Sequence, residues 1–367
     1  MLSKLELQYT LALLRTPSLG DISIKKLIGK VGSAQAVFKE RKSTLAKIDG
    51  IGLVRLKSFN PSRQLDEAEE EMRFIEDNKI DCYYFQDKHY PEKLKHCIDG
   101  PIILFGRGNI DLVGKRIISI VGTRKITSYG RAFCHELIEE LAPLNPVIVS
   151  GLAYGVDICS HRKALDLGLQ TVACLAHGLN QIYPKSHEKY AKKIEENGGF
   201  LTEFWSSDTF DRNNFLRRNR VIAGLSEATI VIESAEKGGS LVTADIANSY
   251  NREVFAVPGR ATDSQSRGCN DLIKYQKAHV LTNAADIVYH LGWEINEIKK
   301  PQQTQLFVEL DEQEKVIFEF LKDKEKELLD IIALECNLPV FKTASILMNM
   351  ELKGVVRPLP GKLFQLV

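Results

Sequence analysis

The chain has 367 residues, of which 49 are Lys or Arg and 48 are Asp or Glu, so its formal net charge at pH 7 is +1. This balance excludes a protein that binds polyanions over its whole surface, and any polyanion site must be a local patch. The length leaves room for two or three domains, and a hydrophobic fraction of 44% is ordinary for a globular chain.

Residues 1–75 are expected to form a small helical domain in which glycines separate short helices. The stretch "LAKIDGIGLVRLKSF" places Gly50 and Gly52 between two helical patterns, which is typical of a helix-hairpin-helix or SAM-like module. The alternative is a glycine-rich interaction module that does not touch DNA. The apolar run at residues 11–14 is too short for a signal peptide or a membrane span, so we expect no membrane association.

Residues 76–298 alternate short β-rich runs with helical stretches, which predicts an α/β fold with a doubly wound, mostly parallel, Rossmann-like sheet. Gly122 and Gly151 lie at the ends of two of these runs, and Arg124 and Gly178 each lie two residues beyond a run. Ligands of such sheets bind beyond the carboxyl ends of the strands. The predicted strands are residues 116–122, 146–151, 170–176, 200–204, 228–234, 253–259 and 279–282.

The polar stretch "KKPQQTQ" at residues 299–305 is predicted to be a linker. Residues 306–367 then show helical patterns followed by a small hairpin, which indicates a winged-helix-like domain. Many such domains bind DNA and many dock proteins. The first helical stretch, "DEQEKVIFEFLKDKEKELLD", is mixed in charge and largely acidic, which favours protein docking.

One stretch, "NNFLRRNRVIAGLS", is rich in arginine, and together with Arg212 it holds four within nine positions. A helix whose N-cap is Asn213 or Asn214 would carry Arg218 in its first turn, beside free N–H groups that favour anions. Phe215 lies at the same end, and arginine with an aromatic ring is typical of single-stranded nucleic-acid sites. The alternative is a ladder of ion pairs between the arginines and the acids Asp211, Glu203 and Glu233.

A second basic segment lies in "IVGTRKITSYGRAF", where a strand ends at Gly122 and a loop carries Arg124 and Lys125 towards a helix. Small residues at such a turn let the backbone approach a phosphate closely. In the following motif, "VSGLAYGVDICSH", we interpret Asp157 as a helix cap and His161 as its hydrogen-bond partner.

In their order and spacing, these motifs resemble the DNA-processing protein A (DprA/Smf) family over about residues 85–292, through "IVGTRKITSYG", "VSGLAYGVDICSH", "GLNQIYP", "FLRRNRVIAGLS", "GGSLVTADIA", "VFAVPGR" and "GCNDLI". The resemblance implies an extended Rossmann-like domain that binds and protects single-stranded DNA and forms homodimers. It also implies that the protein loads the RecA recombinase onto incoming DNA during natural transformation. It implies no catalytic residue, cofactor or metal.

The candidate DNA-binding residues combine the cations and the ring of these motifs with the glycines that shape the pocket floor. They are Gly122, Arg124, Lys125, Gly151, Gly178, Lys185, Phe215, Arg218, Asn219, Arg220, Gly239 and Ser240. The sequence departs from the family pattern at Cys159, at His177 and at Gln276, which concerns the pocket and the edge of the dimer rather than the fold.

The main alternative is an enzyme, a Rossmann-like nucleotide N-glycosidase of the phosphoribohydrolase type. Those enzymes carry an acid/base glutamate three residues after a threonine, whereas Ile246 stands three residues after Thr243 here and the nearest acid is Asp245. A catalytic carboxylate must reach its proton, so we expect no enzymatic activity. A protein whose arginines bind only the acids of a partner protein is a further alternative.

The cysteines and histidines give weaker alternatives. Cys159 with His161 and Cys174 with His177 have spacings close to those of metal ligands or of a Cys–His nucleophile. The chain contains no C-x-x-C pair, so its 7 cysteines are interpreted as reduced thiols of a cytoplasmic protein. Neither a Walker A loop nor a G-x-G-x-x-G motif is present, which removes the best support for a nucleotide cofactor.

Overall fold

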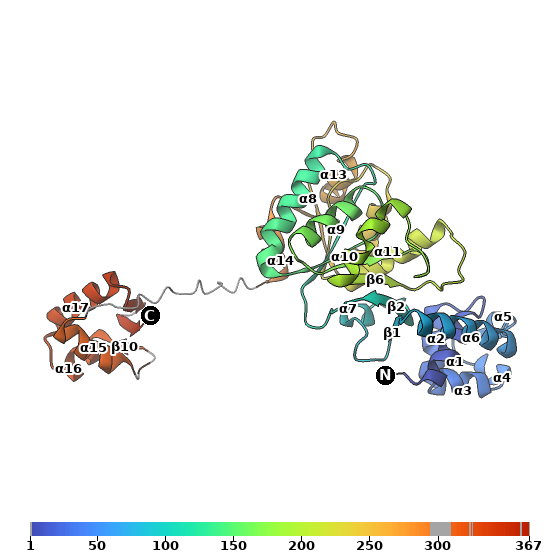
Figure 1. Cartoon of the computed structure of the whole chain (residues 1–367), viewed down its shortest axis with the longest axis horizontal. Coiled ribbons are helices and arrows are strands. Elements are labelled where there is room, and N and C mark those ends of the chain that lie inside the picture. The colour runs from blue at the N-terminus through green and yellow to red at the C-terminus, as the bar shows by residue number, and fades with distance from the viewer. Residues whose placement is uncertain (1, 294–309, 323, 325, 360–361, 367) are drawn as a thin grey trace. The chain divides into compact units, whose positions relative to one another are not determined.

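The computed structural model describes residues 2–293, 310–322, 324, 326–359 and 362–366. The chain divides into two compact units, Met1–Glu294 and Ile295–Val367, and Figure 1 gives the course of the chain by colour. The linker predicted at residues 299–305 lies outside the described residues.

A nine-stranded sheet organises the first unit, with strand order β1-β2-β6-β5-β4-β3-β7-β8-β9. All pairings among β3 to β9 are parallel, as predicted from their apolar runs. Each of these strands overlaps a predicted one. Their bounds are β3 Ile117–Val121, β4 Val147–Ser150, β5 Thr171–Cys174, β6 Gly198–Thr202, β7 Ala228–Val231, β8 Glu253–Ala256 and β9 His279–Val280.

Two strands at one edge of this sheet were not predicted from the sequence, β1 Asp81–Tyr84 and β2 Ile103–Gly108. Strand β1 pairs antiparallel with β2, and β2 pairs antiparallel with β6. They extend the parallel sheet with an antiparallel edge, which is common in doubly wound folds.

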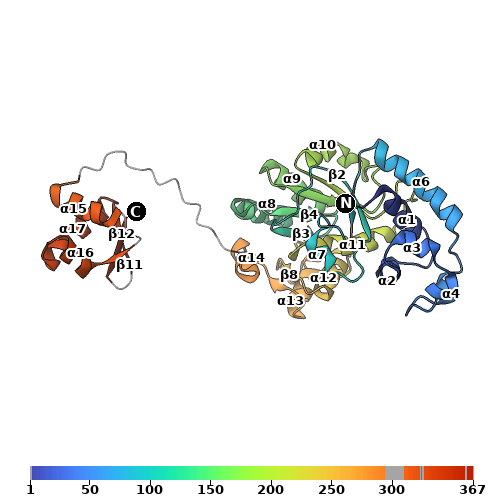
Figure 2. The same cartoon turned by 90° about the horizontal axis from the view of Figure 1, so that it is seen from below.

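Helices cover both faces of the sheet. Successive side chains of a strand point to opposite faces, so these apolar strands have side chains to bury on each face. Ile118 and Ile148 pack in one buried cluster, whereas Val121 and Val149 pack in another on the opposite face. Figure 2 shows α8 and α12 on opposite sides of β3. The helices of this part are α7 Glu92–Lys95, α8 Ser128–Leu141, α9 Val156–Asp166, α10 Glu188–Glu196, α11 Asn213–Leu225, α12 Gly239–Ser249, α13 Arg267–Lys274 and α14 Ala284–Leu291, with 3-10 turns η1 Ala142–Leu144 and η2 Lys185–His187.

The part of the chain before the sheet is helical, as predicted. Gly50 and Gly52 adopt φ values of 78° and 61°, so the turn between α4 and α5 uses a conformation that favours glycine. The helices of this part are α1 Lys4–Leu14, α2 Asp21–Val31, α3 Ala34–Lys39, α4 Lys42–Leu45, α5 Gly52–Arg55 and α6 Pro61–Asp77.

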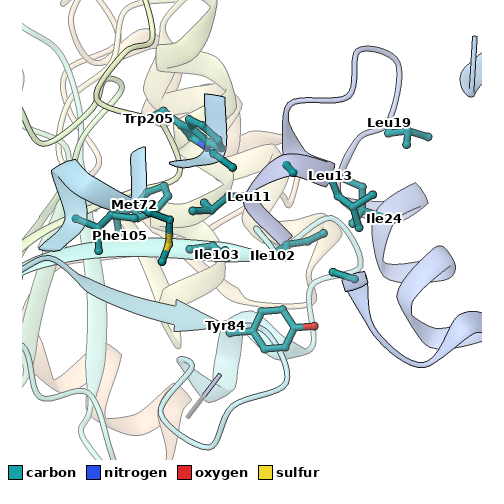
Figure 3. Close-up of a cluster of buried hydrophobic side chains, with 14 of the residues drawn as sticks. Leu11, Leu13, Leu19, Ile24, Met72, Tyr84, Ile102, Ile103, Phe105 and Trp205 are labelled. Atoms are coloured by element: carbon teal, nitrogen blue, oxygen red, sulfur yellow. The ribbon is translucent and has the colours of Figure 1, made fainter. Parts of the chain in front are cut away.

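This helical part shares a core with the antiparallel edge of the sheet. Leu11 and Met72 pack in the same buried cluster as Ile103, Phe105 and Trp205 (Figure 3). The division expected at residue 75 is therefore not a division into separate compact units, because both sides of it belong to Met1–Glu294.

In its described residues, the second unit has the predicted winged-helix arrangement, with three helices and a small sheet. Ile317, Ile332 and Leu347 are among its buried core residues. Within the described residues, no single helix is long and apolar enough to cross a membrane; α16 and α17 meet that criterion only as a pair, which is bent by 108°. The elements are α15 Glu312–Lys322, α16 Leu329–Glu335, α17 Val340–Leu352, β10 Glu327–Leu328, β11 Val356–Leu359 and β12 Leu363–Leu366, with strand order β10-β12-β11.

Candidate nucleic-acid interface

A cavity of about 620 Å³ opens at the carboxyl ends of β3 and β7. These neighbouring strands form the switch point of the sheet. From β3 the chain continues to β4 on one side, whereas from β7 it continues to β8 on the other side. Loops diverge at such a point and leave a crevice for a ligand. The cavity lining includes Gly122, Arg124, Phe215, Arg218, Asn219, Gly239 and Ser240, so the structure brings these predicted site residues together.

Three aromatic rings form one wall of the cavity, and we call Tyr183, Phe210 and Phe215 the aromatic wall. Their ring centroids lie 4.9 Å apart for Tyr183 and Phe210, 5.6 Å for Phe210 and Phe215, and 6.2 Å for Tyr183 and Phe215. Tyr183 and Phe210 are half exposed. The guanidinium carbon of Arg124 lies 5.4 Å from the centre of the Phe215 ring. This wall therefore presents stacking surfaces beside a cation, as single-stranded nucleic acid requires.

Helix α11, which carries Phe215 and Arg218, begins at Asn213. The Asp211 carboxylate accepts the Asn213 N–H at 2.8 Å. The prediction that Asn213 or Asn214 is the N-cap was wrong, because both residues already lie inside the helix. Asp211 instead satisfies a free N–H group at the helix start.

From the sequence, Arg218 was expected to reach past the end of α11. Instead, its side chain is buried under the cavity. Its guanidinium donates to the Cys174 carbonyl and, from Nε, to Asn219 Oδ1 at 3.3 Å. Burial lowers the pKa of Arg218, and the nearby Asp157 carboxylate opposes this shift. Burial likewise raises the pKa of Asp157, and Arg218 opposes that shift. These two buried groups of opposite charge place a cation at the cavity floor.

Gly151 supports this buried pair without lining the cavity. A Cβ atom at Gly151 would lie 2.4 Å from Asp157 Oδ2 and 2.7 Å from Arg218 Nη2, so only glycine leaves room for both groups. Asp157 also accepts the Ala153 N–H at 3.1 Å. His161 does not bond to Asp157, contrary to our interpretation: its Nε2 lies 2.6 Å from the Gly151 carbonyl and its Nδ1 2.7 Å from Thr171 Oγ1.

The first turn of α12 forms another part of the cavity lining. Its N-cap, Gly238, has no side chain to bond the free N–H groups, and such a helix start favours anions. Asn219 Nδ2 donates to the Gly239 carbonyl at 3.2 Å, and Ser240 Oγ donates to Ser234 Oγ at 3.0 Å. These bonds fix the turn against α11 and the loop after β7. Gly122, at the end of β3, also allows a close approach: a Cβ atom there would lie 2.9 Å from the Glu233 carbonyl oxygen, which is too close for another residue type.

Arg220 is a predicted DNA contact that the structure places elsewhere. It does not line the cavity. Its guanidinium lies 2.5 Å from Glu203 Oε2 and 3.1 Å from Asp21 Oδ2, and it donates to the Asp99 carbonyl. Arg217 also contacts Glu203, at 3.2 Å. These two arginines therefore form ion pairs of the kind that the alternative interpretation predicts, with Glu203 as the shared acid.

Three further predicted residues are not brought to the cavity lining. Lys125 is exposed one position beyond Arg124, and Lys185 is exposed in η2 beside Pro184. Gly178 is buried against the chain after β6, where a Cβ atom would lie 2.2 Å from the Trp205 carbonyl oxygen. Gly178 thus permits a close backbone approach rather than forming a pocket floor.

Several lining residues were not among the predicted site residues, among them Tyr183, Phe210, Asp157, Arg212 and Lys237. Tyr183 stands in the motif "GLNQIYP", and Arg212 was counted only as part of the basic stretch. Phe210 and Lys237 lie in loops that follow β6 and β7, where no periodic pattern singles them out. Their membership of the site depends on how the loops fold over the sheet.

The structure also bears on the alternative sites. Asp245 lies outside the cavity lining and pairs with Lys277 at 2.9 Å. Asp157 is the acid in the cavity lining, and the buried Arg218 guanidinium nearby opposes the rise of its pKa. Among the described residues, no group of three or more His, Cys, Asp and Glu side chains is placed to hold a metal ion.

The sequence profile of the family described as DNA recombination-mediator protein A matches residues 81–292, and that of the DprA winged helix domain matches residues 301–362. The chain belongs to the DprA family. "DNA processing protein DprA" of Bacillus subtilis (strain 168) is 40% identical over 213 residues, which is 58% of this chain and 71% of the relative. "Protein Smf" of Escherichia coli (strain K12) is 34% identical over 277 residues, 74% of each chain.

Two solved DprA structures match the fold. The X-ray structure of DprA from Streptococcus pneumoniae gives a TM-score of 0.65 at 29% identity, covering 77% of this chain and 97% of the other. DNA processing protein A from Helicobacter pylori gives a TM-score of 0.52 at 29% identity, covering 58% and 95%. The latter structure is described for its single-stranded DNA binding mode.

The three departures from the DprA pattern have distinct surroundings. Cys159 is buried beside Cys134 between α8 and α9. His177 is buried under the aromatic wall, with Nδ1 2.8 Å from the Gly178 carbonyl, and burial lowers its pKa. Gln276 adopts a φ of 56°, a conformation that favours glycine.

Proposed function

We propose that this chain binds single-stranded DNA in the cavity between β3 and β7. We further propose that it protects incoming DNA and loads the RecA recombinase onto it during natural transformation, in the cytoplasm. The observation that carries the DNA-binding proposal is the meeting of Arg124 and Arg218 with the aromatic wall and the first turn of α12. Guanidinium groups and a helix N-terminus suit phosphates, and exposed rings suit unpaired bases.

The side-chain amide in the cavity lining is already occupied and does not offer itself to a base edge, which supports binding that tolerates many sequences. Asn219 is the side-chain amide in its lining, and both ends of this amide are occupied, by the Arg218 guanidinium and the Gly239 carbonyl. Stacking and phosphate contacts do not depend on base identity.

Filter binding of oligo-dT and of a duplex of equal length, each at two salt concentrations, tests the proposal. We expect tighter binding of the single strand and a marked loss of affinity at high salt, because phosphate contacts release counterions. Equal affinity for the two forms would contradict it. An N-glycosidase would instead release adenine from AMP, and we expect no release, because Asp245 is paired with Lys277 outside the cavity.

We also propose that the chain forms homodimers through the α/β part. Strand β9 is the last strand of the nine-stranded sheet, and among the described residues its strand partner is β8 alone. Its residue Val280 is half exposed. An unpaired edge is a ready site for another chain. Light scattering at micromolar concentration should give twice the mass of the monomer, and a strict monomer would remove this proposal.

The RecA-loading proposal rests on membership of the DprA family, and RecA filament formation on oligo-dT, with and without this protein, tests it.

For the second unit we propose docking of a protein rather than of DNA. Helix α17 exposes Phe341, Met348 and Leu352 on one face, at 79%, 63% and 81%. Exposed apolar side chains gathered in this way are typical of protein interaction sites.

A further inference from the structure

A second set of aromatic rings and cations begins at the rim of the cavity. Tyr154 is half exposed and, with Phe215 and Arg218, lines a small pocket beside the main cavity. Its hydroxyl lies 3.0 Å from Ser186 Oγ, and its ring meets the His187 ring edge-on with centroids 4.9 Å apart. Tyr154 therefore links the cavity to the start of α10.

The set continues over α9 and α10. The ring centroids of His187 and Tyr190 lie 6.5 Å apart. Two cations lie over the Tyr190 ring: the guanidinium carbon of Arg162 is 5.6 Å and the Lys189 ammonium 5.2 Å from its centroid. We call Tyr154, Arg162, His187, Lys189 and Tyr190 the α9–α10 track.

The charges of this track are available to a ligand. Arg162 and Lys189 are exposed, and within the described part of the chain neither takes part in an ion pair with an acid. The contrast is Lys163, the neighbour of Arg162, which pairs with Glu139 at 3.1 Å. The track thus combines two uncompensated cations and a ring at one place, and Tyr154 makes it continuous with the cavity.

We infer that a single strand bound in the cavity continues past Tyr154 and onto the α9–α10 track, where Tyr190 receives a base and Arg162 and Lys189 contact phosphates. This inference rests on the proposed DNA binding in the cavity. A polyanion with flat bases fits the track, because each cation over the ring suits a phosphate while the ring suits a base. The track would lengthen the strand that one protein molecule covers.

Oligo-dT of two lengths distinguishes the track from the cavity. A strand of about 6 nucleotides fits within a single stacking site, whereas one of about 30 exceeds it. Arg162→Ala and Lys189→Ala should each weaken the long strand and flatten its salt slope by roughly 0.7. Tyr190→Leu keeps the apolar packing of this half-buried side chain but removes the π face, and should cost about fivefold or more on the long strand. All three should bind the short strand as the parent does.

Lys274 and Tyr275 give a matched control, because the Lys274 ammonium lies 5.5 Å from the centre of the exposed Tyr275 ring in another part of the chain. Lys274→Ala and Tyr275→Leu should leave both lengths unaffected. The inference is overturned if the track variants bind the long strand like the parent, or if the short strand weakens by the same factor. Failure of the cavity proposal is a different result, in which Arg124→Ala and Phe215→Ala leave binding of the short strand unchanged.

Discussion

Arg218 and Arg220 lie two positions apart in α11 yet have different environments. Arg218 donates to the Cys174 carbonyl under the cavity, whereas Arg220 contacts Glu203 and, at 3.1 Å, Asp21 at the first residue of α2. Residues two positions apart in an α-helix are separated by about 200° around the helix axis, so their side chains point to nearly opposite sides. One arginine therefore serves the cavity and the other joins the sheet to the N-terminal helices.

Replacing Arg124 with alanine should reduce the salt dependence of DNA binding. Arg124 is exposed in the cavity lining, so its loss removes about one phosphate contact and flattens the salt slope by roughly 0.7 on every sequence alike. Titrations of oligo-dT across a salt series measure the slope. Lys125→Ala is the matched control, since Lys125 does not line the cavity; an equal change there would place the contact outside it.

The aromatic wall should contribute through stacking rather than charge. Phe215→Ala, Tyr183→Ala and Phe210→Ala should each cost about 1–3 kcal/mol of binding free energy and leave the salt slope nearly unchanged. Tyr183→Phe retains the ring and should bind as the parent does. Tyr275→Ala is the control, because this exposed ring lies outside the cavity lining. If Tyr183→Ala and Tyr275→Ala have the same affinity for DNA, a ring in the wall matters no more than an exposed ring elsewhere.

Arg220→Ala should destabilise the fold and leave the salt slope of DNA binding unchanged. The substitution leaves the buried Glu203 carboxylate and Asp21 without their shared cation, which costs about 3–5 kcal/mol of unfolding free energy. Arg217→Ala removes an exposed partner of the same acid and should cost less than about 1 kcal/mol. Urea denaturation compares the two variants, and a flattened slope for Arg220→Ala would restore it as a DNA contact.

His161 should make the fold sensitive to mild acid. Burial lowers the pKa of this histidine to about 4, below the 6.5 of an exposed imidazole. Between these values the unfolded chain binds the extra proton, so the contribution is complete above pH 6.5 and is lost as the pH falls towards 4. The loss is roughly 3 kcal/mol.

His161→Gln removes the titrating group, and its unfolding free energy should fall less between pH 6.5 and 4 than that of the parent. The comparison is of the pH dependence in each protein, so a constant loss of stability in the variant does not affect it. Parallel curves for the two proteins would show that His161 does not titrate in this range.

Deleting residues 306–367 should leave most single-strand affinity intact. The exposed face of α17 is apolar rather than basic, with Phe341, Met348 and Leu352, so the second unit offers little to a polyanion. The expected loss is less than about tenfold, or roughly 1.4 kcal/mol. A larger loss in oligo-dT binding by the truncated chain would assign part of the DNA site to this unit.

Much of the sheet could be predicted from the sequence because parallel strands covered on both faces need continuous apolar runs, as in residues 116–122 and 228–234. Strands β1 and β2 could not be predicted in this way, since they form an antiparallel edge that depends on pairing with a distant strand. In that pairing, Phe105 of β2 lies opposite Thr202 of β6. Residue types at the carboxyl ends of the strands predicted where the cavity lies, because a switch point exists in any doubly wound sheet.

The fold class, the family motifs and four residues of the cavity lining, Arg124, Phe215, Arg218 and Gly239, could be predicted from the sequence alone. The partners of the individual arginines in the stretch could be found only from the folded structure. The helical spacing separates Arg218 from Arg220, but their partners Cys174, Glu203 and Asp21 come from other elements. Whether an arginine meets a ligand or a buried carboxylate depends on which side chains the fold places opposite it. That choice is made by long-range packing, which leaves no local pattern in the sequence.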